Sequence, residues 1–423
     1  MLTTETLTPI LDLTHVRAQF PSLAQTVNGH PAAFLDGPGG TQAPQRVIDA
    51  IANYLSRDNA NTGGAYATSR RTDAMIAEAR AAMADFLHCA ADEVAFGPNM
   101  TTMTYAMSRA IGRELKPGDE IVVTRLDHDA NVSPWLQMAQ DRGITVRWAE
   151  IHDQDCTLDM ADLASKINPN TKLVAAGYAS NAVGTINPVK EIVALAHKVG
   201  ALAYIDAVHY SPHGLIDVEA LDCDFLACST YKFFGPHMGV LFGKREHLQR
   251  FRPYKVRPNT NAIPNCWEWG TLNHECIAGI AACVEYIADL GRHARSEASS
   301  RRAAIEAAYA AIHEHERALL ERMMTGLNKI PSLKIYGITD PARFHERCAT
   351  LAIRIPGHTP LELATQLGDR GIFTWDGNYY ALNLTEHLDV EKSGGFLRIG
   401  LVHYNTAEEV ERLVAAMREI VGE

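Results

Sequence analysis

KLVAAG at residues 172–177, VKEIVALAHK at residues 189–198 and LAYID at residues 202–206 follow one another in the middle of the chain. The first and third segments are short apolar runs with the length of buried strands. The second has its apolar residues at helical spacing. A strand, a helix and a second strand in this order predict a parallel βαβ unit whose strands are covered on both faces.

The same alternation extends toward the N-terminus. Residues 119–124 and 145–149 are predicted strands, and residues 135–142 between them form a predicted helix. After Gly279 the pattern changes to an Ala/Glu/Arg-rich segment at residues 281–327, which predicts one long helix or a helix pair. The centre of the chain is therefore expected to be an α/β layer structure.

The last hundred residues have a mixed pattern. Their predicted elements are strands at 333–336, 349–354 and 396–401 and helices at 360–369 and 406–421. We expect three parts: an N-terminal arm at residues 1–30 that packs on a small domain, a large cofactor-binding domain at 31–285, and the small α+β domain at 286–423.

Composition and charge narrow the class of protein. The chain has 423 residues, 47% of them hydrophobic, and a formal net charge of −11. This acidic balance argues against binding to nucleic acid or to an anionic membrane surface. No apolar run is long enough to span a membrane, and residues 1–5 lack the basic start of a signal peptide, so we expect a cytoplasmic protein.

Eight cysteines are scattered along the chain. They form no CxxC pair and no Cys/His spacing suited to zinc. The sequence therefore predicts no metal site and a reduced cellular compartment.

Asp206 and Lys232 are the most informative pair of residues. Asp206 ends a predicted strand, and ligands of open α/β sheets bind beyond such strand ends. A carboxylate there can keep a pyridine nitrogen protonated, and a buried lysine can form a Schiff base with an aldehyde. Taken singly, the two residues have ordinary alternatives, a turn residue and a solvated charge.

A phosphate site is predicted nearby. The segment from Phe96 to Thr102 breaks the chain just before a helical run, which places free backbone N–H groups and the Thr101 hydroxyl at a helix N-terminus. Ser229, three residues before Lys232, supplies a second hydroxyl. Simple capping by Asn99 or Thr101 is the alternative. An aldehyde-binding lysine, a pyridinium carboxylate and a phosphate cradle together describe pyridoxal 5′-phosphate (PLP).

Further motifs resemble the class V aminotransferase superfamily of PLP fold type I and, within it, the cysteine desulfurases and selenocysteine lyases. The resemblance runs from about Phe20 to the C-terminus. Its motifs, in chain order, are FLDGPGG (34–40), DHDANVSPW (127–135), SNAVGT (180–185), DAVH (206–209), STYK (229–232), WGTLN (269–273) and FLRIG (396–400). It implies an α/β fold with a mostly parallel, seven-stranded sheet in the large domain and a smaller α+β C-terminal domain.

The resemblance also implies roles for single residues. Lys232 is the Schiff-base lysine, Asp206 holds the pyridinium nitrogen, and His128 stacks on the cofactor ring; these three are the expected catalytic residues. The expected cofactor-binding set is Asn99, Met100, Thr101, His128, Asn181, Asp206, His209, Ser229, Tyr231, Lys232 and Thr271. The expected substrate-binding set is Arg398, which clamps the carboxylate, with Gly37, Asn181 and Tyr379. Because the family's threonine at position 271 reaches the phosphate of the neighbouring subunit, a homodimer with shared active sites is implied.

One departure from the family concerns the reaction itself. Cysteine desulfurases carry a nucleophilic cysteine on a loop shortly before the carboxylate-binding arginine, but residues 374–381 here are TWDGNYYA. No cysteine follows Cys348. Cys266 and Cys276 flank Thr271, and two interpretations are open for them. They replace that thiol, or they simply pack against helices.

We therefore expect a PLP-dependent enzyme that acts on a small amino-acid substrate by cysteine desulfurase-like or C–S lyase chemistry, without the usual loop cysteine. An aminotransferase or an amino-acid epimerase of the same superfamily is the first alternative, because the fold does not choose among these outcomes. A non-catalytic descendant of the fold is the second.

Overall fold

The computed structural model describes residues 11–295 and 297–422. A seven-stranded sheet forms its larger part, with the strand order β4-β12-β11-β10-β9-β5-β6. Only β12 runs against its neighbours. The strands are β4 (Val94–Gly97), β5 (Glu120–Thr124), β6 (Thr145–Ala149), β9 (Thr171–Gly177), β10 (Leu202–Asp206), β11 (Phe225–Ser229) and β12 (Gly239–Gly243).

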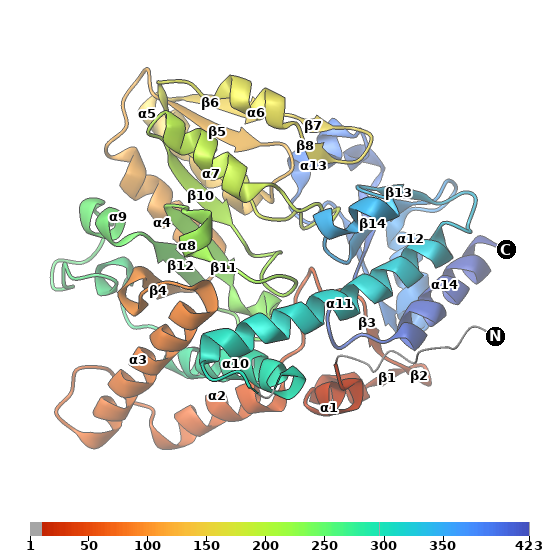
Figure 1. Ribbon diagram of the computed structural model, residues 1–423, viewed down its shortest axis with the longest axis horizontal. Coiled ribbons are helices and arrows are strands. Elements are labelled where there is room, and N and C mark those ends of the chain that lie inside the picture. The colour runs from red at the N-terminus through yellow and green to blue at the C-terminus, as the bar shows by residue number, and fades with distance from the viewer. Residues whose placement is uncertain (1–10, 296, 423) are drawn as a thin grey trace.

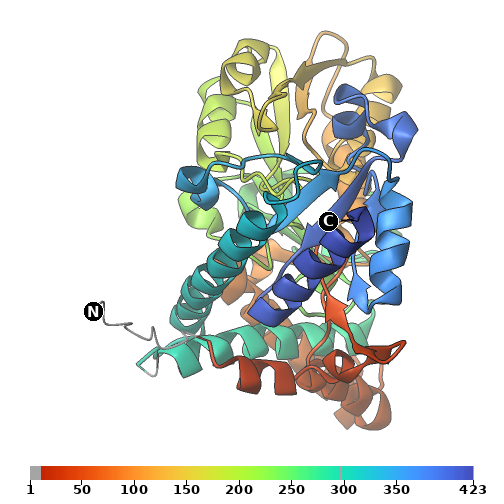
Figure 2. The ribbon, with the colours of Figure 1, turned by 90° about the vertical axis from the view of Figure 1, so that its right-hand side faces the viewer.

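Helices cover both faces of this sheet, as Figures 1 and 2 show. Alternate strand residues point to opposite faces, so Val122 packs in one core with α7 and α10 while Ile121 packs in a second core with α4 and α5. The helices of this part are α2 (Gln45–Arg57), α3 (Ala67–Leu87), α4 (Met100–Gly112), α5 (Ser133–Arg142), α6 (Met160–Lys166), α7 (Val189–Lys198), α8 (Val218–Leu221), α9 (Arg245–Arg250) and α10 (His274–Ala294).

A four-stranded antiparallel sheet with the order β13-β14-β17-β16 forms the smaller, C-terminal part. Its core is a separate apolar cluster that includes Leu351, Leu397 and Met417. The elements are β13 (Lys334–Tyr336), β14 (Thr350–Arg354), β16 (Trp375–Gly377), β17 (Phe396–Gly400), α11 (Arg301–Leu327), α12 (Pro360–Asp369), α13 (Leu382–His387) and α14 (Ala407–Val421). The expected α/β fold with a mostly parallel seven-stranded sheet and a smaller α+β part is confirmed.

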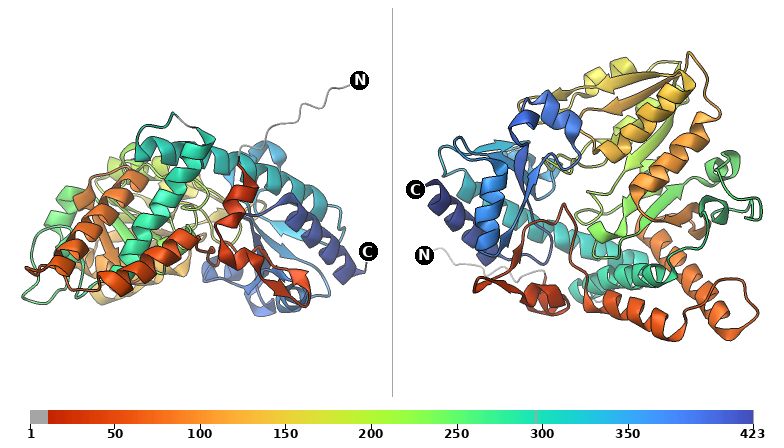
Figure 3. Two further views of the ribbon diagram at one scale, coloured as in Figure 1. Left: turned by 90° about the horizontal axis from the view of Figure 1, so that it is seen from below. Right: turned by 180° about the vertical axis from the view of Figure 1, so that it is seen from behind.

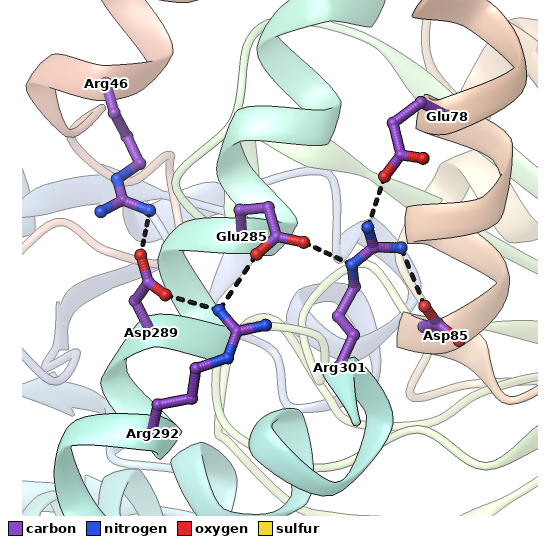
Figure 4. Close-up of polar contacts among 7 residues, drawn as sticks. All are labelled: Arg46, Glu78, Asp85, Glu285, Asp289, Arg292 and Arg301. Atoms are coloured by element: carbon purple, nitrogen blue, oxygen red, sulfur yellow. Dashed lines mark hydrogen bonds and ion pairs between the residues drawn. The ribbon is translucent and has the colours of Figure 1, made fainter. Parts of the chain in front are cut away.

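Helices α10 and α11 resolve the choice between one long helix and a helix pair in favour of the pair. They pack closely at Gly291, where a Cβ atom would lie 1.7 Å from the carbonyl oxygen of Ala304. From there α11 runs toward the small sheet, where it lies beside α14 (Figures 1 and 2). The start of α11 is fastened by Arg301, whose guanidinium contacts Glu78, Asp85 and Glu285 (Figure 4).

Described residues near the N-terminus contact the small C-terminal part (Figure 3). Arg17 in α1 (Leu13–Ala18) forms an ion pair of 2.9 Å with Glu409 of α14. Strand β3 (Ala33–Phe34) pairs in parallel with β15 (Ile372–Phe373). Two further two-stranded sheets are formed by β1 (Thr26–Val27) with β2 (His30–Pro31) and by β7 (Ile151–His152) with β8 (Thr157–Leu158). The first ten residues of the expected arm lie outside the described residues, and the boundaries at 30 and 285 stay predictions.

No helix in the described part of the chain is both long and apolar enough to cross a membrane.

Candidate active site

A cavity lies at the carboxyl ends of β9, β10 and β11, beside the N-terminus of α4. This is the position expected for a ligand in an open α/β sheet. The predicted residues that line it together are Asn99, Met100, Thr101, His128, Asn181, Asp206, His209, Ser229, Tyr231 and Lys232. They come from loops and strand ends that are far apart in the sequence, and their individual roles stay predictions.

Lys232 lies in a short turn after β11, and its Nζ donates hydrogen bonds to the carbonyl oxygens of Pro38 and Gly39. Burial and, to a smaller extent, the nearby Arg398 cation lower the pKa of this amine to about 7, against the opposing effects of Asp206 and Asp36. A substantial fraction of Lys232 is therefore neutral near pH 7. Only the neutral amine can attack an aldehyde or accept a proton.

Asp206 ends β10, and its Oδ1 accepts a hydrogen bond of 2.9 Å from the backbone N–H of Val208. Burial raises the pKa of this carboxyl to about 7, and the neighbouring Asp127 carboxyl raises it as well. A cation placed against Asp206 would stabilise the ionised form and lower its pKa. The site is therefore prepared for a positively charged group, such as a protonated pyridine nitrogen.

The start of α4 forms the predicted anion cradle. The Asn99 side chain caps the helix by accepting from the N–H of Thr102 at 2.8 Å, and Ser229 Oγ accepts from the N–H of Met100 at 3.1 Å. Gly239 of β12 packs against this turn, because a Cβ atom there would lie 2.5 Å from the carbonyl carbon of Asn99. Asn99 therefore caps the helix, as the alternative interpretation expected. Ser229 and Thr101 line the cavity at the helix N-terminus, and their role as phosphate ligands stays a prediction.

His128 is neutral at physiological pH. Burial lowers its pKa to about 3, and the positive charges of Lys232 and Arg398 contribute to the same shift. Its Nδ1 accepts a hydrogen bond of 3.0 Å from the N–H of Ala130, which fixes the ring. The Tyr380 ring lies 5.4 Å from the His128 ring and covers its outer side. A neutral, oriented imidazole suits the predicted stacking role.

Arg398 of β17 does not line the cavity itself, but it contacts Asn181, which does. Its Nη1 donates to the carbonyl oxygen of Asn181 at 3.0 Å, and the Tyr379 ring lies 4.1 Å from its Cζ atom. Burial lowers the pKa of the guanidinium to about 10, and its buried Nε has no hydrogen-bond partner. Gly37 lies close to the end of β17, because a Cβ atom there would come within 3.3 Å of the carbonyl oxygen of Gly400. Arg398 therefore keeps a donor for a carboxylate.

The loop at residues 374–381 is held by hydrogen bonds to its backbone. Tyr379 and Tyr380 have positive φ angles of 53° and 61°, which are costly for aromatic residues. The carbonyl oxygens of these two residues accept hydrogen bonds from Asn181 Nδ2 and from the N–H of Asp129. All eight cysteines lie in the described residues, and none of them lines the cavity around Lys232.

Thr271 lies apart from the other predicted ligands within this chain. It lines a different cavity, together with Asn61 and Thr62. Its expected role toward the phosphate therefore requires a second subunit and stays a prediction.

Two residues of the cavity were missed from the sequence. Asp127 Oδ1 accepts hydrogen bonds from Thr124 Oγ1 and from the N–H of Gly177, and burial raises its pKa to about 6. Asn187 donates to the carbonyl oxygen of Gly177 at 2.8 Å. Asp127 directly precedes His128 in a motif singled out above, so its position beyond a predicted strand was the available signal.

Residues 33–413 match the family model described as aminotransferase class-V. The chain belongs to this family. A cysteine desulfurase of Dickeya dadantii (strain 3937) is 33% identical over 421 residues, which cover 96% of each chain. Among solved structures, the apo cysteine desulfurase of Thermococcus onnurineus NA1 has a TM-score of 0.84 at 27% identity and covers 95% of this chain and 98% of its own. The cysteine desulfurase CsdA of Escherichia coli has a TM-score of 0.83 at 26% identity, with coverage of 97% and 98%.

Class V aminotransferases depend on PLP, and this chain is accordingly a PLP-dependent enzyme. The cavity fits that cofactor. Lys232 offers a partly neutral amine, Asp206 a carboxyl that a pyridinium would ionise, and Ser229 a hydroxyl at the phosphate cradle. The buried Oδ1 atoms of Asn181 and Asn187 have no partner, so the cavity keeps two acceptors for a polar ligand.

Proposed function

We propose that the enzyme is a cysteine desulfurase-like C–S lyase that releases its sulfur product directly, without passing sulfur to an enzyme thiol. The observation that supports this is the tyrosine loop at residues 374–381. By the resemblance to the family, this loop corresponds to the one that carries the nucleophilic cysteine, and no cysteine lines the cavity around Lys232. An enzyme thiolate is required to store sulfur as a persulfide.

The residues of the site divide the work as follows. Arg398 binds the substrate carboxylate through its free guanidinium donors, and His128 and Asp206 hold the cofactor in position. Bound PLP supplies an electron sink that makes the Cα–H bond of an amino acid acidic. The neutral Lys232 amine takes the Cα proton.

The overall reaction balances with water alone. The Cα proton moves to Lys232 Nζ, and the Cβ–S bond breaks with its electron pair on the sulfur, which leaves as a thiol after protonation. Hydrolysis of the 2-aminoacrylate product gives pyruvate and ammonia. The substrate is therefore cysteine or a cysteine S-conjugate, and no oxidant or acceptor protein is needed.

The direct test is product analysis with cysteine, cysteine S-conjugates and common amino acids. We expect catalytic formation of pyruvate and a thiol or sulfide, its loss in Lys232→Ala, and its retention in the surface control Lys329→Ala. The double variant Cys266→Ala/Cys276→Ala is expected to keep its turnover. Formation of alanine with sulfur bound to the protein would contradict the proposal.

The same assay separates the other reactions of the superfamily. Stoichiometric conversion to pyridoxamine phosphate identifies an aminotransferase, and loss of optical activity without a new product identifies an epimerase.

We further propose that the active enzyme is a homodimer with shared active sites, located in the cytoplasm. The separation of Thr271 from Lys232 within one chain supports the shared sites, because the family's phosphate contact at this position comes from a partner. Eight unpaired thiols support a reducing compartment.

A further inference from the structure

His209, His213 and Cys348 meet behind the cofactor cavity. Each offers one nitrogen or sulfur atom, these three atoms lie within 4.8 Å of one another, and all three side chains are buried. Two imidazoles and a thiol are the ligand set that zinc prefers in proteins. We propose that this cluster is a binding site for a zinc-like divalent cation.

The hydrogen bonding of the two imidazoles supports a ligand between them. The Nε2 atoms of His209 and His213 are both buried and have no hydrogen-bond partner. Buried polar atoms in folded proteins nearly always have one, so two orphaned nitrogens in one cluster call for a bound species. The His213 side chain is 4% exposed, which leaves bulk water no direct contact with Nε2.

A buried carboxylate already contacts the His213 ring at its other nitrogen, Nδ1. Its Nδ1 lies 2.7 Å from Oε2 of the buried Glu316. A Glu316 carboxylate accepts a hydrogen bond from Nδ1–H, which leaves the lone pair on Nε2 free to bind a metal. This carboxylate–histidine arrangement is the usual outer shell of zinc sites and fixes the tautomer of the ligand.

The charges also balance. Binding breaks the S–H bond of Cys348, the proton leaves to solvent, and a sulfur–metal bond forms. A divalent cation, one thiolate and the Glu316 carboxylate sum to zero, which limits the cost of a buried charge. The buried guanidinium of the adjacent Arg347 adds a positive charge that attracts the thiolate.

Access and geometry are compatible with a cation. A second cavity, on the side away from Lys232, is lined by His213, Glu316 and Cys348 and provides an entry path. In a tetrahedral zinc site, nitrogen and sulfur ligands are about 3.5 Å apart. The three donor atoms, which lie within 4.8 Å of one another, would therefore have to move closer by about 1 Å to bind zinc.

The site has a consequence for the cofactor cavity, because His209 lines both. A cation on one nitrogen of His209 fixes the ring and requires the second nitrogen to carry the proton. The metal would thus be structural, and it would keep His209 as a hydrogen-bond donor. This inference does not depend on the reaction proposed above.

The test measures zinc binding to the PLP-loaded enzyme by competition with a chromophoric chelator. We expect about one tightly bound zinc per chain, affinity at least about tenfold weaker in Cys348→Ala and His213→Gln, and about 10- to 100-fold weaker in Glu316→Gln. Two matched controls should keep the zinc affinity of wild type. Cys223→Ala changes another buried cysteine, and His313→Gln changes another histidine of the second cavity. The cofactor absorbance and melting temperature of each variant report its folding.

X-ray absorption at the zinc edge gives an independent readout in the unmodified enzyme. One sulfur and two imidazole ligands are expected. The proposal is overturned if wild-type enzyme binds no zinc, if Cys348→Ala and His213→Gln bind it as well as wild type, or if the spectrum shows no sulfur ligand.

Discussion

At the residue scale, Lys232 and Arg398 are two buried cations that share one site. Each is deprived of water, and the Arg398 charge lowers the pKa of the Lys232 amine. The two acids that oppose this effect, Asp206 and Asp36, themselves have raised pKa values of about 7 and about 6. This balance leaves the Lys232 amine partly neutral, and removing Arg398 should raise the pKa of the amine.

This balance predicts the pH dependence of cofactor binding. Because only the neutral amine attacks the PLP aldehyde, the rate of reconstitution of apoenzyme should rise with pH through about 7 and then level off. Arg398→Gln removes a nearby positive charge, raises the pKa of Lys232 and moves the midpoint to higher pH. Stopped-flow absorbance measures the rate. Arg322→Gln, at an exposed ion pair, should leave the midpoint unchanged, and a wild-type midpoint near 10 would refute the argument.

The carboxylate-binding role of Arg398 is tested by a conservative change. Arg398→Lys keeps the charge but loses the planar, bidentate donor set, so KM for amino-acid substrates should rise by about 10- to 100-fold. The absorbance of the bound cofactor should stay as in wild type, since Arg398 does not line the cofactor cavity. Steady-state kinetics measure the change, and an unaltered KM would remove Arg398 from the substrate site.

At the scale of elements, the pair α10 and α11 connects the two sheets, and charged side chains fasten its turn. Arg301 contacts carboxylates from α3 and α10 (Figure 4), and its side chain is 20% exposed. Arg301→Met should lower the free energy of unfolding by about 1–2 kcal/mol, because it leaves Glu78 and Asp85 without their cation, while Glu285 keeps its ion pair with Arg292. Urea denaturation measures this. Arg317→Met, which breaks one exposed helical pair, should change stability by less than about 0.5 kcal/mol.

The contact between these helices makes a second prediction. Gly291→Ala should destabilise the protein by about 1–3 kcal/mol, because the new Cβ would meet the Ala304 backbone at 1.7 Å and force the helices apart. Alanine is otherwise the better helix former by about 1 kcal/mol. The control is Gly368→Ala in α12, where a Cβ has no neighbour within 4 Å, and this change should stabilise the protein. Equal effects at both positions would contradict the role of close packing at Gly291.

At the scale of the whole molecule, shared active sites predict complementation between two inactive variants. If Lys232 acts with the partner's Thr271, a heterodimer of Lys232→Ala and Thr271→Ala regains one intact site. Random mixing should then restore about a quarter of wild-type activity, because half of the dimers are heterodimers with one working site each. The mixed sample is assayed after unfolding and refolding together. An active monomer in analytical ultracentrifugation, or no recovery on mixing, would argue against the shared site.

The sequence predicted the bounds of single helices and strands better than it predicted which strands pair with each other. α7 (Val189–Lys198) and β10 (Leu202–Asp206) match their predicted bounds, since apolar periodicity is a local property. The reversed direction of β12 and the pairing of β3 with β15 depend on contacts between segments that are far apart in the sequence, and no local pattern contains them.

The same limit applies to the candidate site. The predicted residues that line the cavity belong to recognisable motifs, and some of them, such as Asp206 and Ser229, end a strand. Asp127 was missed because a residue after a strand has many ordinary roles. The cluster of His213 and Cys348 was missed because 135 residues separate them, and zinc-type spacing in sequence covers only ligands from one short segment.

The segment from Ala33 to Thr41 touches both sheets at once. Leu35 bonds through its backbone to Phe373 and Gly400 of the C-terminal part, while the carbonyl oxygens of Pro38 and Gly39 accept from the Lys232 amine. These nine residues therefore connect the C-terminal sheet to the Lys232 amine through backbone hydrogen bonds. A displacement of the C-terminal sheet would move the two carbonyl oxygens that hold the amine, so the hydrogen bonding of Lys232 depends on how the two parts of the molecule are positioned.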